Sequence, residues 1–326
     1  MKKSISVRET VLLLGGTGFI GKNIIDYVHK NVEFSSSYKF IILSRDIKRD
    51  IDDSAAYVFG DYADKNVLIS LFSKWNFTKV FHCATSHTPI SSINNILGDI
   101  NSNLIATIGL LDVMKDFGCN SIVYFSSGGA VYGDKDIDSI PETEICSPVS
   151  SYGVIKLTIE NYLRLYQKQY GINYLILRIS NPFGVFHTSD SQGIINIAVR
   201  RAVRKEELEV WGDGIQTKDY IYVEDLVKII FKLLNKNILN QTINIGSGKS
   251  ISLNNLLDKI KFFVPSFQIK YIESKPTDVK NFCLDISLLK SIIDIEFTDF
   301  ENSIIKTVLW ETKQIENDKN EFKIYQ

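Results

Sequence analysis

The sequence predicts an α/β protein with a doubly wound parallel sheet, followed by a smaller α+β lobe. Three observations lead to this fold class. Short apolar runs alternate with helix-length amphipathic segments through the first half of the chain, and a glycine-rich turn follows the first run. After about Arg178 the alternation stops, and glycine and proline become frequent. We therefore expect one domain over residues 1–179 and a second over residues 180–326, with some interleaving.

The strands of the sheet are expected at six apolar runs rich in β-branched residues. Nearly continuous hydrophobicity is typical of parallel strands that helices cover on both faces. The expected strands are Val11–Leu14, Phe40–Leu43, Ala55–Phe59, Val80–Cys83, Ile122–Phe125 and Tyr174–Leu177. The helical patterns between them are Gly21–Lys30, Asn66–Trp75, Asn101–Phe117 and Ser151–Tyr170. The polar residues from Glu311 to Gln326 are expected to form a loosely held terminus.

Composition and charge exclude several classes of protein. With 37 Lys and Arg against 38 Asp and Glu, the chain of 326 residues has no basic excess for nucleic acid and no cationic face for a membrane. The apolar run Val11–Leu14 is shorter than a signal-peptide core or a membrane span. The scattered cysteines and histidines show no metal-ligand spacing, so we expect neither a metal site nor disulfides. A cytoplasmic location is expected.

The first predicted strand leads directly into a glycine-rich turn and then a helix. The spacing is G-x-x-G-x-x-G. Glycine lets the backbone turn sharply and approach a pyrophosphate, while the N-terminus of the following helix attracts its negative charge. In a βαβ unit, this pattern predicts the dinucleotide-binding turn of a Rossmann domain. The residues expected to contact the cofactor here are Gly15, Thr17, Gly18, Phe19, Ile20 and Gly21.

The second predicted strand ends in Ser44 and Arg45, where an NAD site usually carries an acidic residue bonded to the ribose 2′-hydroxyl. An acid at this place would repel a 2′-phosphate, whereas Arg45 can pair with it and Ser44 can hydrogen-bond to it. These two residues favour NADP(H), with NAD as the alternative if Arg45 is an ordinary surface residue. After the third strand, Asp61 is expected either to accept a hydrogen bond from the adenine amino group or to serve as a turn residue.

A candidate catalytic pair is found in the pattern Y-x-x-x-K at the start of a long amphipathic helix. The i, i+4 spacing places Tyr152 and Lys156 on one face of that helix. An ammonium group near a phenol favours the phenolate, so we expect the pKa of Tyr152 to fall from about 10 towards neutrality. The phenol then exchanges a proton with an alcohol or a ketone while a hydride moves.

Five motifs occur together and in order: GGTGFIG, SSGGAVYG, SYGVIK, NPFG and KDYIYVED. This set resembles the extended short-chain dehydrogenase/reductase family over roughly residues 8 to 312. It is most similar to the branch that modifies nucleotide sugars, which includes UDP-hexose 4-epimerases, sugar-nucleotide 4,6-dehydratases and 4-ketohexose reductases. The resemblance implies a cofactor domain over residues 1–179 and a lobe over residues 180–326 that binds a nucleotide-diphosphate sugar. It also implies a homodimer through the helix from Ser151, although burial within one chain explains that apolar pattern nearly as well.

The resemblance assigns roles to individual residues. It implies that Tyr152 and Lys156 are catalytic, and that Lys156 also contacts the nicotinamide ribose. Asn103, Tyr62 and Ala84 are implied at the cofactor site, and the implied substrate contacts are Ser86, Ser127, Asn181, Lys218 and Lys275. Lys218 and Lys275 occupy positions where the family usually has arginine. Lysine keeps the charge but loses the bidentate geometry, and either lysine is alternatively a solvated surface charge.

After the fifth predicted strand the sequence departs from the family's pattern. The epimerases carry a serine or threonine, bonded to the reacting sugar oxygen, where this chain has Gly128. The dehydratases carry Asp-Glu where this chain has Gly129 and Ala130, so elimination of water is disfavoured. Ser127 is the candidate to polarise the sugar oxygen, although a shift of one residue along a strand turns a side chain to the other face. Alternatively, Ser126 and Ser127 cap backbone groups, and a water or a backbone N–H polarises the oxygen.

The preferred functional interpretation is an NADPH-dependent reductase of a 4-keto nucleotide sugar. A dTDP-4-keto-6-deoxyhexose is the expected substrate, in the biosynthesis of surface polysaccharide such as O-antigen. Arg45 decides this preference, because a reductant drawn from solution in each turnover suits NADP(H). The first alternative is a UDP-hexose 4-epimerase, acting on glucose and galactose or their N-acetyl forms, with bound NAD. The second is a nucleotide-binding protein without catalytic activity.

Overall fold

The computed structural model describes residues 8–45, 55–273 and 281–324, which form two compact units. The first unit consists of Met1–Gly133, Ile145–Ile179 and Phe231–Ile243. The second consists of Asp134–Glu144, Ser180–Ile230 and Asn244–Gln326. The chain therefore leaves the first unit three times, after Gly133, Ile179 and Ile243, and returns to it twice.

A seven-stranded sheet forms the centre of the first unit, in the order β10-β6-β5-β4-β1-β2-β3. Its strands are β1 (Glu9–Leu14), β2 (Tyr38–Ser44), β3 (Ala55–Phe59), β4 (Lys79–His82), β5 (Ser121–Ser127), β6 (Asn173–Ile179) and β10 (Gln241–Ile245). Strands β1 to β6 are parallel and follow the order 3-2-1-4-5-6 of a Rossmann domain. The fold class expected from the sequence is confirmed. Strand β10 is an addition, contributed by a segment far along the chain.

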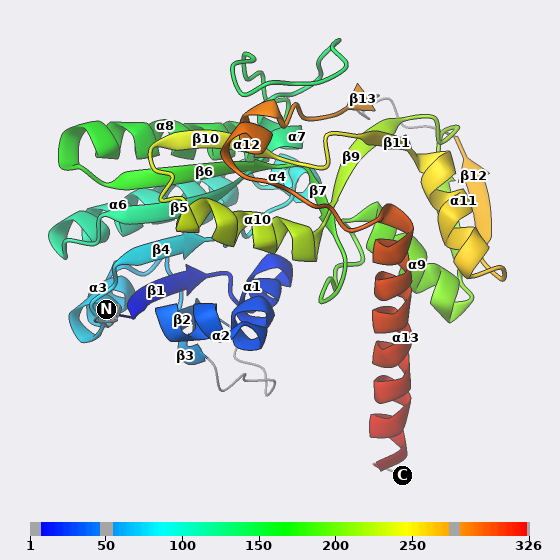
Figure 1. The fold of residues 1–326 in the computed structure, drawn as a ribbon, viewed down its shortest axis with the longest axis horizontal. Coiled ribbons are helices and arrows are strands. Elements are labelled where there is room, and N and C mark those ends of the chain that lie inside the picture. Colours follow the sequence, from blue (N-terminus) through cyan, green and yellow to red (C-terminus); the bar gives the residue numbers. More distant parts are fainter. Residues whose placement is uncertain (1–7, 46–54, 274–280, 325–326) are drawn as a thin grey trace. The chain divides into compact units, whose positions relative to one another are not determined.

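Helices cover both faces of this sheet (Figure 1). They are α1 (Phe19–Lys30), α2 (Val32–Ser37), α3 (Lys65–Lys74), α4 (Pro89–Asn94), α5 (Ile96–Asp99), the π-helical segment η1 (Ile100–Ile105), α6 (Ala106–Asp116), α7 (Gly128–Val131), α8 (Ser151–Tyr170) and the end of α10 (Val223–Asn235). Because successive strand residues face opposite sides, Leu12 and Leu14 pack with residues of α3, α6 and α8. On the helices α1 and α10, Tyr27 stacks on Phe231 with 5.3 Å between ring centres.

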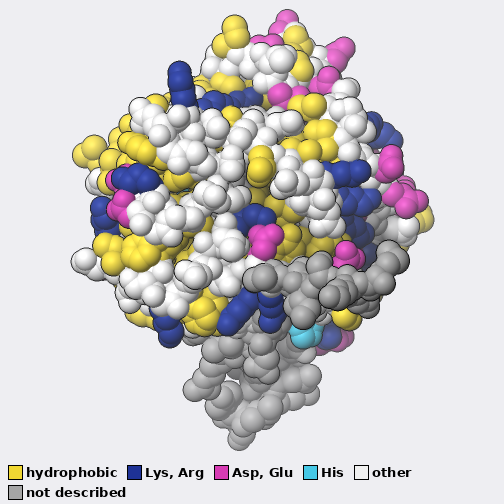
Figure 2. All heavy atoms as spheres, turned by 60° about the vertical axis from the view of Figure 1, so that its left-hand side comes forward, with side chains coloured by type: hydrophobic (Ala, Val, Ile, Leu, Met, Phe, Trp, Pro, Cys, Tyr) yellow, Lys and Arg dark blue, Asp and Glu magenta, His cyan; other side chains and the backbone are white. Residues whose placement is uncertain are grey.

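One helical stretch of the described residues, Ile96–Asp116, is long and apolar enough to span a membrane by length and composition alone. Its side chains instead contribute to the core of the first unit, where Leu110 and Met114 are fully buried. The face drawn in Figure 2 carries basic and acidic side chains interspersed among apolar and uncharged ones.

The second unit contains a four-stranded and a two-stranded sheet. Its strands are β7 (Asn181–Phe183), β8 (Glu207–Trp211), β9 (Thr217–Tyr222), β11 (Ser250–Ser252), β12 (Gln268–Ile272) and β13 (Asn281–Phe282). Strand β9 pairs with β7, β11 and β13, and β8 pairs with β12. The helices are the start of α10, α9 (Ile194–Arg204), α11 (Leu253–Phe263), α12 (Ser287–Ile292) and α13 (Phe300–Ile324).

The expectation of a loosely held terminus from Glu311 is wrong. Helix α13 continues to Ile324, and Glu311 is buried against α9, where its carboxylate lies 2.9 Å from the Arg200 guanidinium. Burial of an ion pair requires good geometry and further hydrogen bonds, and Arg200 also donates to the His187 carbonyl. A polar composition gave no sign of this contact, because it depends on a partner more than a hundred residues away.

Candidate active site

The turn after β1 has the geometry expected of a dinucleotide site. Gly15 adopts φ +81°, and a Cβ there would lie 2.8 Å from the Ala84 backbone nitrogen. A Cβ on Gly21 would overlap the Gly15 carbonyl oxygen, so only glycine lets α1 start this close to the turn. The N-cap, Gly18, provides no side-chain hydrogen bond, and no acidic residue lies in the first turn of α1. This helix N-terminus therefore fits the pyrophosphate of a dinucleotide.

The end of β2 lies beside this turn. The Ser44 and Thr17 hydroxyl oxygens are 3.0 Å apart. An Arg45 nitrogen lies 3.6 Å from an Asp61 carboxylate oxygen, and both side chains are largely or partly exposed, at 65% and 39%. Asp61 also accepts a hydrogen bond from the Ala63 N–H at 2.9 Å, as a turn residue does. From the sequence, we expected independent roles for Arg45 and Asp61. In the structure, their side chains face one another.

Three more of the expected site residues meet near η1. The Tyr62 hydroxyl donates to the Ser102 carbonyl at 2.7 Å. Asn103 accepts from the Ser86 N–H at 3.1 Å, and the Ser86 and Ser102 hydroxyl oxygens are 2.6 Å apart. Single π-helical turns inside helices are frequent at functional sites, and here η1 carries both Ser102 and Asn103.

Helix α8 positions the candidate catalytic pair. The Ser150 hydroxyl caps the helix by accepting from the Gly153 N–H, and Gly171 ends it with φ +72°. The Lys156 ammonium donates to the Phe125 carbonyl on β5 at 2.7 Å. It lies 5.6 Å from the centre of the Tyr152 ring. The spacing therefore brings the two side chains together, as expected for one helix face.

Burial dominates the protonation of this pair. It lowers the pKa of Lys156 to about 8, because water no longer solvates the ammonium, while Cys83, Glu160 and Asp99 act in the opposite direction. It raises the pKa of Tyr152 to about 12, against a hydrogen bond from Ser127 that lowers it. The expectation that the nearby ammonium of Lys156 lowers the pKa of Tyr152 from about 10 towards neutrality is therefore wrong. The loss of water around the phenol raises its pKa by more than the Ser127 hydroxyl lowers it.

The two serines at the end of β5 have different partners. The Ser126 hydroxyl is buried and donates to a Glu160 carboxylate oxygen at 2.7 Å. The Ser127 hydroxyl instead acts on the Tyr152 phenol, whose pKa it lowers. Strand β5 runs through Ser127, so the two side chains leave it on opposite faces. Of the two serines, Ser127 is thus the one that reaches the candidate catalytic residue.

Several residues of the site were missed by the sequence analysis. A small cavity is lined by Tyr152 and Lys156 together with His82, Ala84, Thr85, Asp99, Asn103, Tyr124, Ile155 and Ile159. Burial lowers the pKa of His82 to about 3, and this ring is 2.9 Å from the Thr107 hydroxyl. Asp99 supplies a carboxylate from α5. The dehydratases carry their acidic pair at the positions of Gly129 and Ala130, which lie on α7. The sequence did carry one indication of this: Asp99 lies four residues before Asn103 in a helical pattern, which places both residues on the same helix face.

In the second unit, the expected substrate residues lie on neighbouring strands. Asn181 on β7 is paired in register with Tyr220 on β9, and its amide donates to the Asp219 carbonyl at 2.8 Å. Lys218 is half-buried on β9, two residues before Tyr220. Lys275 lies outside the described residues, so the structure does not show whether it joins them.

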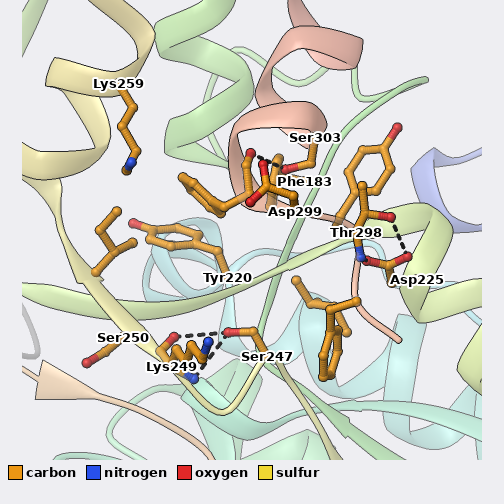
Figure 3. Close-up of a pocket in the computed structure, with 15 residues that line it drawn as sticks. Phe183, Tyr220, Asp225, Ser247, Lys249, Ser250, Lys259, Thr298, Asp299 and Ser303 are labelled. Carbon is orange, nitrogen blue, oxygen red and sulfur yellow. Dashed lines mark hydrogen bonds between the residues drawn. The ribbon is translucent and has the colours of Figure 1, made fainter. Parts of the chain in front are cut away.

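The second unit also encloses a cavity of about 560 Å³. Lys259, Tyr220 and Lys249 lie along one side of it, and Phe183 borders its interior (Figure 3). Deeper in, Asp225 accepts two hydrogen bonds from Thr298, each of 2.8 Å. The volume and the mainly apolar lining with a few polar groups are typical of a small-molecule site. Neither Asn181 nor Lys218 lines this cavity. Among the described residues, no group of three His, Cys, Asp or Glu is arranged to hold a metal ion.

Comparisons with known proteins agree on one family. The model described as "NAD dependent epimerase/dehydratase family" matches residues 11–246. A Methanocaldococcus jannaschii protein named "Putative UDP-glucose 4-epimerase" is 34% identical over 309 residues, which cover 92% of this chain and 97% of that protein. An Escherichia coli dTDP-4-dehydro-6-deoxyglucose reductase is 32% identical over 262 residues, 78% of this chain and 82% of that protein. The Thermotoga maritima UDP-glucose 4-epimerase, solved with UDP-glucose, has a TM-score of 0.87 at 28% identity, covering 94% of this chain and 99% of its own.

Proposed function

Because this chain belongs to the NAD-dependent epimerase/dehydratase family of nucleotide-sugar enzymes, we propose that it is a 4-epimerase of a UDP-hexose with tightly bound NAD. The observation that carries the chemistry is the group formed by the buried Lys156 and the partly exposed Tyr152 and Ser127. This group can donate and accept a proton, and Gly129 and Ala130 occupy the two positions where the dehydratases carry Asp-Glu. The relatives named as UDP-glucose 4-epimerases match more of this chain than the dTDP-sugar reductase does, which reverses the order of preference that Arg45 suggested.

The reaction assigned to these residues is oxidation and re-reduction at one sugar carbon. NAD would accept the hydride from C4 and return it to the other face of the ring. The Tyr152 oxygen takes the C4 hydroxyl proton in the first half-reaction and gives it back in the second. With substrate bound, the Ser127 hydroxyl turns its one proton from the phenol to the same sugar oxygen, in place of the hydroxyl that Gly128 lacks. Lys156, held by the Phe125 carbonyl, stabilises the phenolate.

The ion pair between Arg45 and Asp61 supports NAD as the cofactor. A carboxylate 3.6 Å from the guanidinium offsets its charge, and it would repel a 2′-phosphate at the same place. The dinucleotide turn itself suits either cofactor. The test is to denature the purified protein and identify the nucleotide that it releases. Release of stoichiometric NAD supports the proposal, whereas an empty protein that binds NADPH from solution would favour a reductase.

The cavity of the second unit supports a nucleotide as the activating group of the substrate. Its aromatic lining, including Tyr220 and Phe183, suits a base, and Lys249 and Lys259 suit phosphate groups (Figure 3). Lys218 on the neighbouring part of β9 adds another positive charge. A measured loss of UDP affinity in Lys249→Ala would support this placement, and unchanged affinity would contradict it.

The second candidate is the NADPH-dependent 4-keto-sugar reductase. The specific observation in its favour is Ser44 followed by Arg45, whose guanidinium is largely exposed and whose pairing with Asp61 is loose. The Escherichia coli reductase supports it among the relatives. The same Tyr152 and Ser127 would then protonate the C4 oxygen once, without a return step. A purely nucleotide-binding role without catalysis has less support, because the Tyr152–Lys156 pair is complete.

We also propose a homodimer formed through α6 and α8 in the cytoplasm. On α8 the apolar side chains of Val154 and Leu165 are 48% and 41% exposed, and Ile105 before α6 is 54% exposed. Apolar groups in this position are covered when a second copy packs its own helices against them. Light scattering of the eluting protein should give twice the mass of 37.0 kDa, and a monomeric mass would reject the dimer.

A further inference from the structure

A buried carboxylate lies beside the candidate catalytic tyrosine. Asp99, at the end of α5, is completely buried and lines the same small cavity as Tyr152 and Lys156. A buried charge is costly unless its surroundings compensate it. The function proposed above gives Asp99 no role, because oxidation and reduction at C4 need no carboxylate.

The contacts of Asp99 join three segments around the site. The Asn103 amide on η1 donates to Asp99 Oδ1 at 2.7 Å. The Ser151 hydroxyl, adjacent to Tyr152 in the chain, donates to Oδ2 at 3.2 Å. On the loop after β4, His87 Nδ1 lies 3.6 Å from Oδ1. Within the described part of the chain, His87 is the one ion-pair partner of Asp99, and it is charged only when protonated.

The surrounding groups make the charge of Asp99 relevant to the reaction. The titratable groups that face Asp99, Tyr152 or Lys156 are Tyr62, His82, Cys83, His87, Tyr124 and Glu160. Besides the ammonium of Lys156, which attracts Asp99, His87 is the group in this set that can add a positive charge next to the carboxylate, since burial keeps His82 neutral. The negative charge of Asp99 raises the pKa of both Tyr152 and Lys156.

We propose that Asp99 is a positioning residue of the reaction, which together with His87 sets the charge around Tyr152 and thereby the pH range in which the phenol exchanges its proton. This role rests on the proposed C4 chemistry. When His87 is neutral, the carboxylate opposes formation of the phenolate and keeps the ammonium of Lys156 protonated. When His87 is protonated, the pair is neutral overall and the opposition to the phenolate is relieved.

Replacement of Asp99 and replacement of His87 should therefore have opposite effects on the acidic limb of the kcat–pH profile for conversion of UDP-glucose. Asp99→Asn keeps the shape and the hydrogen bond from Asn103 but removes the charge, so this limb should shift by about one pH unit towards acid. His87→Gln removes the compensating charge, so kcat relative to wild type should fall as the pH falls and stay unchanged in alkali. A merely structural role would lower kcat of both variants at every pH.

A measurement independent of turnover separates this proposal from the proposed function. Protein labelled with ¹³C at the tyrosine Cζ carbon reports phenolate formation by NMR, and Tyr152→Phe identifies the resonance of Tyr152. In Asp99→Asn this resonance should begin to titrate about one pH unit lower than in wild type. Asp112→Asn is the matched control, since Asp112 accepts from the Tyr166 hydroxyl at 2.9 Å outside the site. It should leave Tyr152 unchanged.

The outcomes are distinct. A shifted Tyr152 resonance without any sugar conversion would retain the electrostatic role and reject the 4-epimerase. Superimposable Tyr152 titrations in wild type and Asp99→Asn would overturn the proposal, whatever the activity. If Asp99→Asn does not fold, the pH dependence of His87→Gln decides alone, because His87 lies on a loop and its replacement removes no buried charge. Identical profiles for His87→Gln and wild type would then reject the pair.

Discussion

Ser126 and Ser127 are neighbours at the end of β5, yet the Ser126 hydroxyl donates to buried Glu160 at 2.7 Å, whereas the Ser127 hydroxyl lowers the pKa of Tyr152. The alternation of a β-strand divides the two serines between a structural network and the candidate active site. The network that Ser126 joins holds Arg178 and Glu160 together with 2.7 Å between charged atoms. The candidate active site receives the hydroxyl of Ser127, one residue before Gly128, which supplies none.

Replacement of Ser127 should therefore affect catalysis, and replacement of Ser126 should affect stability. We expect Ser127→Ala to lower kcat by roughly 10- to 100-fold with an unchanged melting temperature, since one donor to the sugar oxygen is lost. Ser126→Ala should retain most of kcat. Its free energy of unfolding should fall by about 1 kcal/mol, since a Glu160 oxygen loses its hydrogen-bond donor. Steady-state kinetics and urea unfolding measure the two effects. Equal losses of kcat in both variants would contradict the division.

Replacement of Lys156 should abolish activity and stabilise the protein. Its pKa falls from 10.5 to about 8 on folding, so the folded state binds fewer protons, and stability rises with pH between about 8 and 10.5. Lys156→Met removes this cost and should gain roughly 2 kcal/mol at pH 7, after allowance for the lost bond to Phe125. Lys168→Met, on the exposed face of the same helix, is the control. Loss of stability at pH 7 in Lys156→Met would show that the ammonium is well solvated.

Addition of one methyl group at the dinucleotide turn should prevent cofactor binding. In Gly21→Ala the new Cβ would overlap the Gly15 carbonyl oxygen, so the turn must move away from α1. We expect at least a tenfold loss of NAD affinity by calorimetry of the apoprotein, or recovery of protein without cofactor. Gly109→Ala places a Cβ in open space on α6 and should be neutral or slightly stabilising. Normal NAD binding by Gly21→Ala would mean that the cofactor does not approach this turn.

Removal of the charge of Glu160 should destabilise the first unit. Glu160 is fully buried and receives Arg178 and Ser126, so Glu160→Gln leaves a buried guanidinium without its counter-charge. We expect a loss of about 3 kcal/mol in urea unfolding. The comparison is Glu301→Gln, which removes an equally short but exposed pair with Lys259 of 2.6 Å and should cost less than about 1 kcal/mol. Similar losses in the two variants would show that burial of Glu160 is not decisive.

The sequence predicted those parts of the protein that depend on local pattern. The parallel strands, the glycine turn and the start of α8 were predictable, because hydrophobic periodicity and capping residues act within a few positions. Strand β10 was missed because its neighbour β6 lies some sixty residues earlier. The burial of Glu311 against Arg200 was missed for the same reason.

At the site, the types of residue were predictable and their protonation was not. The spacing of Tyr152 and Lys156 fixed their common face, but the balance between desolvation and charge depends on how deeply both are buried. The pairing of Arg45 with Asp61 arises from the pairing of β2 with β3, so neither residue alone indicated it. Asp99 was missed because only the folded chain brings α5 and α8 together around it.

The most direct test of the proposed function is the incubation of purified protein with UDP-glucose and no added cofactor, followed by chromatographic analysis of the sugar nucleotide. The 4-epimerase predicts formation of UDP-galactose to an equilibrium mixture, with Tyr152→Phe lowering the rate by at least 100-fold. No conversion of UDP-glucose or of UDP-N-acetylglucosamine, together with stoichiometric consumption of NADPH in the presence of a 4-keto sugar nucleotide, would contradict it and establish the reductase.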